Sequence, residues 1–299
     1  MDRLAAMRAF VEIVDQGSLT AAAEVLERSQ PTMVRTLAAL ETHLGTRLLQ
    51  RTTRRMSLTA DGRDYLVRCR RILADVEEAE RAVGQAEGEL RGDLLMTAPV
   101  EFGRLHVVPA VSDFLARYAR VRVELMLVDR VVDLVEEGVD LAVRIGRLTD
   151  SSMVAVRVGE VRRVVCASPA LLQRTGVPAH PSALSGLPCI RLHNLARAGG
   201  WLFRDGNREL SVKVEGRLGC NQIAAAAAAC VAGAGFSQFL SYQVQHLIRE
   251  GRLKRVLDGF EPAPLPVSLV YSGGRLIPSR LRELISKMKE ALQASAAFA

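Results

Sequence analysis

The side chains best suited to chemistry in this sequence are arginines, and they gather in one short segment. Between residues 47 and 71 there are eight arginines and two aspartates, a net charge of eight minus two, or +6. The arginines are Arg47, Arg51, Arg54, Arg55, Arg63, Arg68, Arg70 and Arg71. A planar guanidinium donates paired hydrogen bonds to phosphate and to the edge of guanine. A genome biased towards arginine would explain the scarcity of lysine but not this clustering, so the segment favours a polyanion as partner.

A second set of polar residues lies just upstream, at the start of a helical pattern over residues 30–44. Ser29 is a good N-cap for this helix, and proline is tolerated in its first turn. One face carries the apolar residues Met33, Leu37, Leu40 and Leu44, and a rotation of about 100° per residue turns the rest away from it. The residues expected on or beside the outer face, near the start of the helix, are Gln30, Pro31, Thr32, Val34 and Arg35.

Shorter helical patterns precede this helix and must position it. Residues 4–14 space their apolar side chains three and four apart, and residues 19–26 form an alanine-rich helix that Ser18 caps after a break at Gly17. Two short helices joined tightly predict a helix-turn-helix, whose second helix offers its first outer residues to the DNA major groove. The alternative is an ordinary helical hairpin in a larger bundle, and the basic segment that follows favours the first reading.

That basic segment predicts a two-stranded wing. Leu48 and Leu49 anchor it, a polar basic tip follows, and residues 56–58 alternate as a returning strand does. Its candidate contacts with phosphates or the minor groove are Arg51, Arg54 and Arg55. A solvated charged loop is the alternative for this piece taken alone.

Strand and helix patterns alternate from residue 92 onward, which predicts an α/β domain with parallel strands. Strands are expected in residues 92–98 and 121–129, and a helix over residues 133–138 is expected to lead into a third strand that ends near Arg144. A helix over residues 220–231 should run into a glycine turn and a strand. A last strand and helix are expected at residues 264–271 and 279–292.

A crevice at the carboxyl ends of such strands is the expected place for a small-molecule pocket. Thr97 and the helix N-terminus at Pro99 and Val100 could hold a carboxylate, and Arg144 could add a charged hydrogen bond. For Arg144 the alternative is a salt bridge to Asp129 or Asp150. The other candidates for lining the pocket are Asp129, Gly146, Leu192, Asn194 and Trp201. Trp201, the only tryptophan, has a place in the hydrophobic core as its alternative role.

Several function classes lack the residues they need. The sequence has no G-x-S-x-G, no phosphate-binding glycine loop and no H-E-x-x-H, so we expect neither an enzyme nor a bound metal or cofactor. The five cysteines are scattered without a C-x-x-C pair, and Cys69 is expected to fill a core. No apolar run reaches about 18 residues and no signal peptide opens the sequence, so we expect a cytoplasmic protein without membrane contact.

Residues 10–62 resemble the winged helix-turn-helix of LysR-type transcriptional regulators. The shared pattern has Gly-Ser before the second helix, Ser-Gln-Pro at the third, then Leu-Glu, Leu-Gly and Leu-Thr-x-x-Gly. One departure is Val34, where the family often has a serine before the recognition-helix arginine, so a methyl contact is expected in place of a hydroxyl contact. The second half resembles the family's effector region, although Phe239-Leu240 stands where Leu-Pro is frequent.

This resemblance implies a multidomain fold, with an α-rich winged helix-turn-helix followed by an α/β, two-lobed, periplasmic-binding-protein-like effector domain. The implied boundaries are 1–59 for the DNA-binding domain, 60–90 for a linker helix and 91–299 for the effector domain. Its first lobe would comprise residues 91–164 and 267–299, and its second lobe residues 165–266. The linker helix, with Leu66, Cys69, Leu73, Val76 and Val83 in one seam, is expected to pair across a homodimer; packing on its own effector domain is the alternative.

The resulting hypothesis is a transcriptional regulator whose dimer, or a homotetramer of two dimers, binds inverted-repeat double-stranded DNA. A small organic or aromatic acid would be its effector. One rival is a regulator that responds to thiol oxidation. The other is a small-molecule-binding protein with an accessory basic domain.

Overall fold

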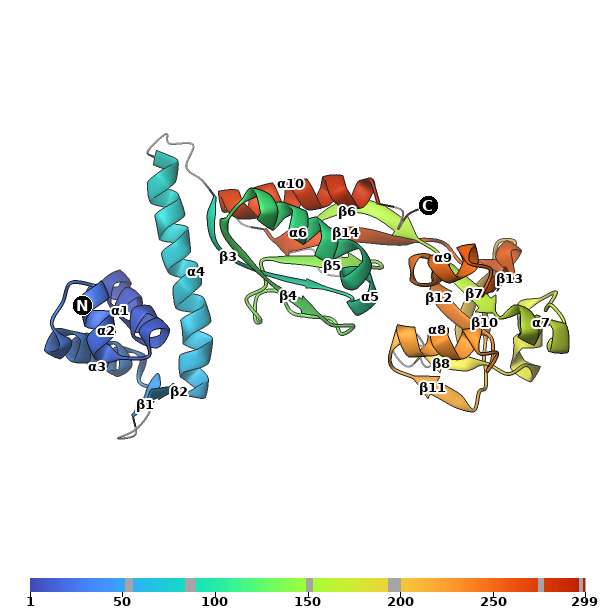
Figure 1. Cartoon of the computed structure of the whole chain (residues 1–299), viewed down its shortest axis with the longest axis horizontal. Helices are drawn as coiled ribbons and strands as arrows, with labels where there is room; N and C mark the ends of the chain where they lie inside the picture. The colour runs from blue at the N-terminus through green and yellow to red at the C-terminus, as the bar shows by residue number, and fades with distance from the viewer. Residues whose placement is uncertain are drawn as a thin grey trace. The chain divides into compact units, whose positions relative to one another are not determined.

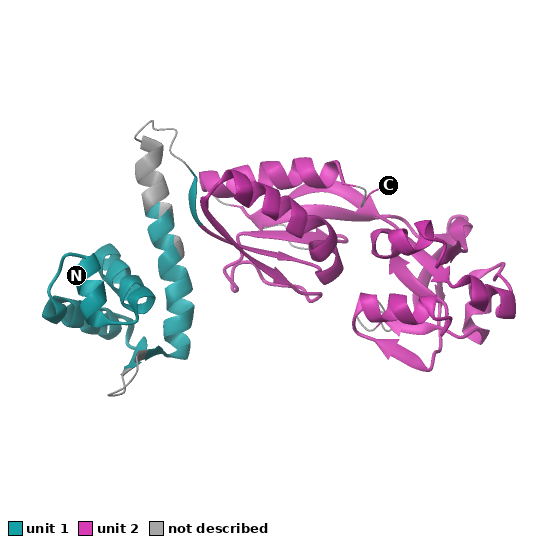
Figure 2. Cartoon of the chain, in the orientation of Figure 1, with its two compact units in different colours: residues 1–92 teal, residues 93–299 magenta. Residues whose placement is uncertain are grey.

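The computed structural model describes residues 1–51, 56–83, 90–148, 153–192, 200–273, 277–295 and 298 (Figure 1). The chain divides into two compact units, Met1–Gly92 and Asp93–Ala299, here called unit 1 and unit 2 (Figure 2). Unit 1 therefore holds both the predicted winged helix-turn-helix and the predicted linker helix. Within the described residues, no helix is both long enough and apolar enough to cross a bilayer.

Three helices open unit 1, and local capping sets their ends. They are α1 (Arg3–Gln16), α2 (Leu19–Val25) and α3 (Gln30–Leu44). Gly17 ends α1 in the left-handed conformation (φ 63°), and the Ser18 hydroxyl accepts hydrogen bonds from the first N–H groups of α2. Ser29 caps α3 in the same way, and Gly45 ends it with φ 69°. The helix-turn-helix and its caps are thus confirmed.

The core of unit 1 forms where these helices meet helix α4 (Ala60–Val83) and the wing, strands β1 (Leu49–Arg51) and β2 (Met56–Leu58). Its fully buried members include Phe10, Ile13, Met33, Leu37 and Leu40. Leu44, expected on the same stripe, is 36% exposed, because the last turn of α3 extends past the core.

Part of the predicted seam of α4 packs inside unit 1, and pairing of the helix across a homodimer stays a prediction. Leu66 and Cys69 are buried in the core of unit 1, where α4 packs against α1, and the Phe10 and Tyr65 rings lie 5.9 Å apart there. An ion pair between Arg70 and Asp15 joins the same two helices. On the outside of α4, Val67 and Ile72 remain exposed.

The motif Leu-Thr-x-x-Gly forms the junction between the wing and α4. The Thr59 hydroxyl accepts the N–H of Gly62 (2.9 Å) and donates to the Arg47 carbonyl (2.7 Å). Gly62 is required because a Cβ there would lie 2.0 Å from the Leu48 carbonyl oxygen. The strands β1 and β2 pair antiparallel, Leu49 opposite Leu58, as the predicted wing requires.

A five-stranded sheet organises the first lobe of unit 2, in the order β4-β3-β5-β14-β6. Its strands are β3 (Arg91–Ala98), β4 (Arg120–Leu127), β5 (Leu141–Ile145), β6 (Met153–Val161) and β14 (Leu265–Ser272). The sheet is mixed, which corrects the expectation of parallel strands: β3 and β5 are parallel, but β14 runs antiparallel to both β5 and β6. The chain comes back from the second lobe into the first along β14, so this strand runs opposite to its neighbours β5 and β6.

Helices pack along this sheet (Figure 1). A continuous helical stretch consists of α5 (Val100–Phe102), the π-helix η1 (Gly103–Val107) and α6 (Val108–Arg117). The C-terminal helix α10 (Ser279–Gln293) packs against α6 and β6. It buries a stripe spaced three and four apart: Leu281, Leu284, Met288 and Leu292.

The second lobe, the elements from β7 to β13, is built around strand β7 (Arg163–Ala167). It pairs antiparallel with β12 (Ser237–Leu240) and with β13 (Lys254–Val256). Alternate residues of β7 enter two cores, Val164 and Cys166 on one face and Val165 and Ala167 on the other. Around it lie α7 (Pro169–Thr175), η2 (Pro181–Gly186), β8 (Ile190–Leu192), β9 (Trp201–Asp205), β10 (Arg208–Val212), β11 (Leu218–Cys220), α8 (Ile223–Val231), α9 (Ser241–Arg249) and η3 (Asp258–Phe260).

The helix expected at residues 133–138 is wrong. The segment forms one turn, with a single helical hydrogen bond from the Glu137 N–H to the Asp133 carbonyl. The Asp133 carboxylate accepts the N–H groups of Val135 and Glu136, and Gly138 (φ 67°) reverses the chain at once. This tight turn stands in the connection between Leu127 and Leu141 in place of the expected helix.

We expect Gly62→Ala to lower the free energy of unfolding of unit 1 by about 1–3 kcal/mol, because the new methyl group meets a backbone oxygen that cannot rotate away. Helix propensity alone predicts the opposite sign, a gain of about 1 kcal/mol. Gly186→Ala is the control, since its Cβ would meet nothing within 4 Å. Unfolding followed by far-UV circular dichroism decides between the two, and an unchanged or higher stability of Gly62→Ala would contradict the close contact.

Candidate functional site

The outer face of α3 is open at its N-terminal end. Gln30, Pro31, Thr32 and Arg35 are exposed, and Val34 is half-buried at the edge of the core. The Ser29 and Thr32 hydroxyls lie 2.8 Å apart, so the cap also holds the Thr32 side chain. The start of the helix thus presents a fixed polar surface.

Arg35 supplies the positive charge of this surface. Its side chain is exposed, and no carboxylate of the described residues pairs with it. A guanidinium on an exposed helix face without an internal partner is available for a ligand with paired acceptors, such as a guanine edge or a phosphate.

One carboxylate joins α3 to the wing. Glu41 Oε1 accepts the N–H groups of Leu48 (2.8 Å) and Leu49 (3.2 Å), so the strand that enters the wing is tied to the last turns of α3. Arg51 ends β1 opposite Met56. Arg54 and Arg55, predicted at the wing tip, lie outside the described residues.

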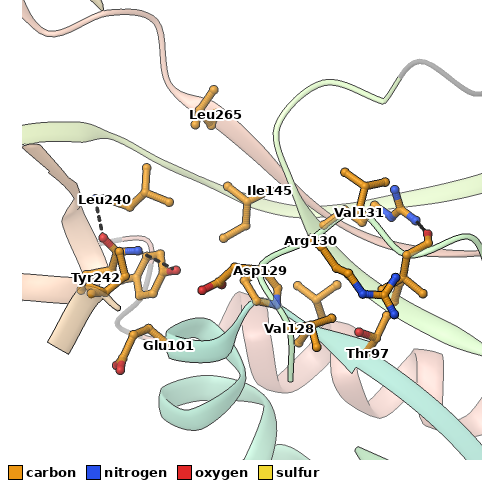
Figure 3. Close-up of a pocket in the computed structure, with 18 of the residues that line it drawn as sticks. Thr97, Glu101, Val128, Asp129, Arg130, Val131, Ile145, Leu240, Tyr242 and Leu265 are labelled. Carbon is orange, nitrogen blue, oxygen red and sulfur yellow. Dashed lines mark hydrogen bonds between the residues drawn. The ribbon is translucent and has the colours of Figure 1, made fainter. Parts of the chain in front are cut away.

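Unit 2 contains a pocket of about 400 Å³, a volume suited to a small molecule (Figure 3). The first lobe contributes the ends of β3 and β5 and the segment after β4. The second lobe contributes residues at the start of β7, α8 and α9. Of the residues predicted from the sequence, Thr97, Pro99, Asp129 and Arg144 line it.

The expected carboxylate seat at the helix N-terminus is already filled by the protein. The Asp129 carboxylate accepts the N–H of Val100 (3.1 Å), so the first free donor of the helix faces an internal anion. The Thr97 hydroxyl donates to the Met126 carbonyl (2.8 Å), and the residue is only 4% exposed. In this structure the Thr97 hydroxyl proton is therefore used within the protein, and a contact of Thr97 with a bound acid stays a prediction.

Arg144 lines the pocket without a charged partner among the described residues. Its guanidinium donates one hydrogen bond, from Nη2 to the Val132 carbonyl, and its other N–H groups can donate to a ligand. The salt bridge to Asp129 that was its alternative role is not among its contacts, and Asp150 lies outside the described residues. A half-buried guanidinium in a cavity is suited to an anionic group of a ligand.

Arg130 also lines the pocket, but it has a carboxylate partner within the protein. Arg130 donates two hydrogen bonds to the Glu137 carboxylate, at 2.7 and 2.6 Å, which lowers the pKa of Glu137 and raises that of Arg130. Both side chains belong to the exposed rim of the first lobe, so screening by water keeps the stability contribution of this pair small.

The second lobe faces the pocket with Tyr242 and Gln243. Gln243 Oε1 accepts the N–H of Leu240 (2.8 Å), and its Nε2 donates to the Tyr242 hydroxyl (3.3 Å). The Tyr242 ring packs edge-on against Phe102 of the first lobe, with centroids 5.1 Å apart. These contacts hold the tyrosine hydroxyl at a defined place in the pocket (Figure 3).

Comparison with known proteins gives this architecture a family. Residues 4–63 match the model for the bacterial regulatory helix-turn-helix protein, lysR family, and residues 87–293 match that for the LysR substrate binding domain. The chain belongs to the LysR family. Members are transcriptional regulators and not enzymes, and this regulator binds DNA through its helix-turn-helix and an effector through its substrate-binding domain.

Individual relatives agree over nearly the whole chain. An HTH-type transcriptional regulator of Xanthomonas campestris is 35% identical, over 92% of this chain and 81% of its own. The regulator PtxR of Pseudomonas aeruginosa is 34% identical, over 95% and 91%. The solved structure of CrgA, a LysR-type transcriptional regulator from Neisseria meningitidis, is 28% identical with a TM-score of 0.62, covering 96% and 98%.

Two residues predicted for the second wall of the pocket of this LysR regulator lie elsewhere. Leu192 and Trp201 are buried in the two cores on either side of β7, because both belong to strands whose inward side chains alternate. Trp201 thus has the core role that was its alternative. Gly146 and Val100 do not line the pocket either: Gly146 donates to the Pro266 carbonyl, and Val100 contributes only its N–H beneath Asp129. Asn194 lies outside the described residues.

Polar pocket residues that were not predicted from the sequence include Glu101, Arg163, Tyr242 and Gln243. A usable signal existed for two of them. The rule that a ligand binds where a strand meets the next helix led to Thr97 and Pro99 in the first lobe. Applied to the junction of β12 and α9 in the second lobe, the same rule leads to Tyr242 and Gln243.

The cysteines bear on the thiol-responsive alternative. Cys69, Cys166, Cys189 and Cys230 are buried, and Cys220 is half-buried. Burial raises the pKa of Cys69 to about 11 and those of Cys189 and Cys230 to about 12, and it raises the pKa of Cys166 as well. These four thiols stay protonated at neutral pH, which makes them poor nucleophiles.

We expect only Cys220 of the five cysteines to react with iodoacetamide in the folded protein, because it alone is not buried. Mass spectrometry after brief treatment near pH 8 should find one adduct, which Cys220→Ser removes, whereas the denatured protein takes up label at every cysteine. Fast labelling of Cys166, Cys189 or Cys230 would contradict their burial and favour the thiol-responsive alternative.

Proposed function

We propose that this LysR regulator binds an inverted-repeat operator through α3 and the wing, and that a small molecule with an acidic group in the unit 2 pocket modulates transcription. The observation that carries the DNA-binding part is the open N-terminal face of α3. There, Gln30, Pro31, Thr32 and Val34 lie on the same helix end as Arg35, whose guanidinium has no internal carboxylate partner among the described residues.

The wing supplies the second half of the DNA interface. Arg51 ends the strand that Glu41 ties to α3, and Arg54 and Arg55 follow it in the sequence. A duplex that meets α3 in its major groove would then also meet this basic segment. These arginines would contact phosphates, which position the protein on DNA, while the α3 residues read the bases. Val34 offers methyl groups, which suit a thymine methyl better than a polar base edge.

An inverted repeat needs two copies of the chain. We propose a homodimer, and a homotetramer of two dimers, in which α4 contributes to the pairing. Because Leu66 and Cys69 are used inside unit 1, the paired face would use the outer residues of α4, among them Val67 and Ile72. Two half-sites would then lie about one helical turn apart, or a multiple of it, roughly 34 Å.

Arg144 supports the acidic effector. Its guanidinium lines the pocket and has no carboxylate partner among the described residues. A carboxylate of a ligand would therefore form an ion pair with it. Pro99 and Asp129 would lie beside that ligand. Of the rival functions, the thiol-responsive regulator has less support because four of its five thiols are buried.

We expect Arg35→Ala to reduce affinity for the operator by about 1–3 kcal/mol and to relax base preference, since a base contact is lost. The operator for this test is the duplex that wild-type protein selects from random sequences. Arg217→Ala is the control, because it removes an equal charge from an exposed site in unit 2. Unchanged base preference in Arg35→Ala would exclude its role in reading the operator.

By contrast, Arg54→Ala should weaken specific and non-specific DNA binding alike and flatten the slope of the salt dependence by about one unit.

We expect Arg144→Gln to weaken binding of a carboxylic-acid effector about tenfold or more, the loss of one charged hydrogen bond. Operator binding without effector should stay at the wild-type level. Calorimetric titration with a panel of carboxylic acids measures the loss, and Arg147→Gln, an exposed arginine outside the pocket, is the matched control. Equal binding of the acids to wild type and Arg144→Gln would place the effector elsewhere.

A further inference from the structure

The pocket holds charges of both signs, and they come from different parts of its wall. Arg144 lies at the end of β5. Glu101 in α5 and Asp129 after β4 form a second, acidic corner beside the helix N-terminus. In Figure 3, Asp129 and Glu101 lie on the side of the pocket that Tyr242 closes, and Arg130 and Thr97 lie towards the opposite side. A ligand that bound only Arg144 would make no contact with this corner.

Glu101 retains an unused acceptor. Its side chain is 12% exposed, and both hydrogen bonds from Arg104, at 3.2 and 2.8 Å, go to Oε2. Among the described residues, no donor reaches its other oxygen, Oε1. Oε1 therefore stays open to the pocket, where it can accept an N–H group of a ligand.

Tyr242 retains an unused acceptor site in the same corner. It is 4% exposed, and its hydroxyl oxygen accepts one hydrogen bond, from Gln243, which leaves a second lone pair for an N–H group of a ligand. Burial raises the pKa of this phenol, and the nearby charges of Asp129 and Glu101 raise it further, so the hydroxyl keeps its proton. Figure 3 shows the hydroxyl and the Asp129 carboxylate pointing towards each other across the corner.

We infer that the effector is a zwitterion of the amino-acid class, with its ammonium group in the corner formed by Glu101, Asp129 and Tyr242 and its acidic group on Arg144. This inference rests on the proposed function, in which Arg144 holds an acid, and adds the second charge. An ammonium group carries three donors and a positive charge, which match an acceptor oxygen of Glu101 and the potential of two carboxylates. A simple carboxylic acid meets only the first half of this arrangement.

The corner lies between the two lobes, so a ligand bound there can couple effector binding to the arrangement of the lobes. Glu101 and Asp129 belong to the first lobe, and Tyr242 belongs to the second. The Tyr242 ring packs edge-on against Phe102 and lies 5.7 Å from the His106 ring, which follows Phe102 on the π-helix η1. An ammonium group in the corner would therefore contact both lobes, and its binding would favour the arrangement of lobes in which the corner is closed.

The test separates the two charges of the ligand. The probes are the standard L-amino acids, the carboxylic acids that lack their amino group, and the amines that lack their carboxyl group. Each is titrated into the full-length wild-type protein, Glu101→Gln, Tyr242→Phe and Arg144→Gln by calorimetry. Tyr242→Phe keeps the ring packing and removes only the hydroxyl. Glu136→Gln, an exposed acid outside the pocket, is the control, and far-UV circular dichroism verifies that each variant is folded.

We expect an amino acid to bind wild type at least about tenfold more tightly than its deaminated acid or its amine, because a charged hydrogen bond is lost in either case. Glu101→Gln should remove most of the preference over the deaminated acid while leaving binding of that acid unchanged, and Tyr242→Phe should reduce the same preference. Glu136→Gln should behave as wild type.

Two other results have different meanings. If deaminated acids bind as tightly as amino acids and Arg144→Gln abolishes both, the zwitterion inference is overturned and the acidic effector stands. If Arg144→Gln leaves every probe unaffected, or if no probe binds the wild-type protein, the pocket assignment fails and the zwitterion inference fails with it.

Discussion

The buried stripe of α3 is the constraint on which the DNA-binding surface depends. Met33, Leu37 and Leu40 are almost fully buried in the core of unit 1, and burying three such side chains contributes several kcal/mol, on the order of 1.5–3 for each. A rotation of the helix that exposed them would lose that energy. The residues on the other side, Arg35 among them, are therefore fixed as the outer face. Glu41, which follows Leu40 in the same helix, accepts the N–H groups at the start of the wing and so ties the wing to α3.

A comparable internal contact determines the chemistry of the pocket. The start of a helix beside a strand end is a place for an anion, and here the protein supplies that anion itself through Asp129. Thr97, whose hydroxyl donates to Met126, is likewise occupied. Arg144 lines the pocket without a carboxylate partner among the described residues, so it is available for an acid, and the corner near Asp129 and Glu101 attracts the opposite charge. The pocket therefore distinguishes ligands by where their charges lie as well as by their size.

Features that depend on a few neighbouring residues could be predicted from the sequence. Gly17, Ser18 and Ser29 cap or end their helices through contacts within three residues, and the three–four spacing of Met33, Leu37 and Leu40 predicts the buried face of α3. The pattern of residues 133–138 misled because Asp133 and Gly138 close a single turn.

Features that depend on distant partners could not be predicted in the same way. Trp201 and Leu192 have the composition of either a core or a pocket wall, and only the pairing of their strands decides which. The capping of Val100 by Asp129 joins residues 29 positions apart, so neither sequence segment shows it. The antiparallel course of β14 follows from the return of the chain from the second lobe. The family resemblance predicted the overall architecture, while these contacts define the site of this particular chain.

Two copies of α3 and the wing, related by symmetry, would read one specific duplex. The most direct measurement is selection of duplexes from a random-sequence library by the full-length protein, followed by footprinting of the enriched sequences. We expect an enriched inverted repeat, with half-sites separated by about one helical turn or a multiple of it and protected together. Retention of duplexes without any enriched sequence, or enrichment of a single half-site with no symmetric partner, would contradict it.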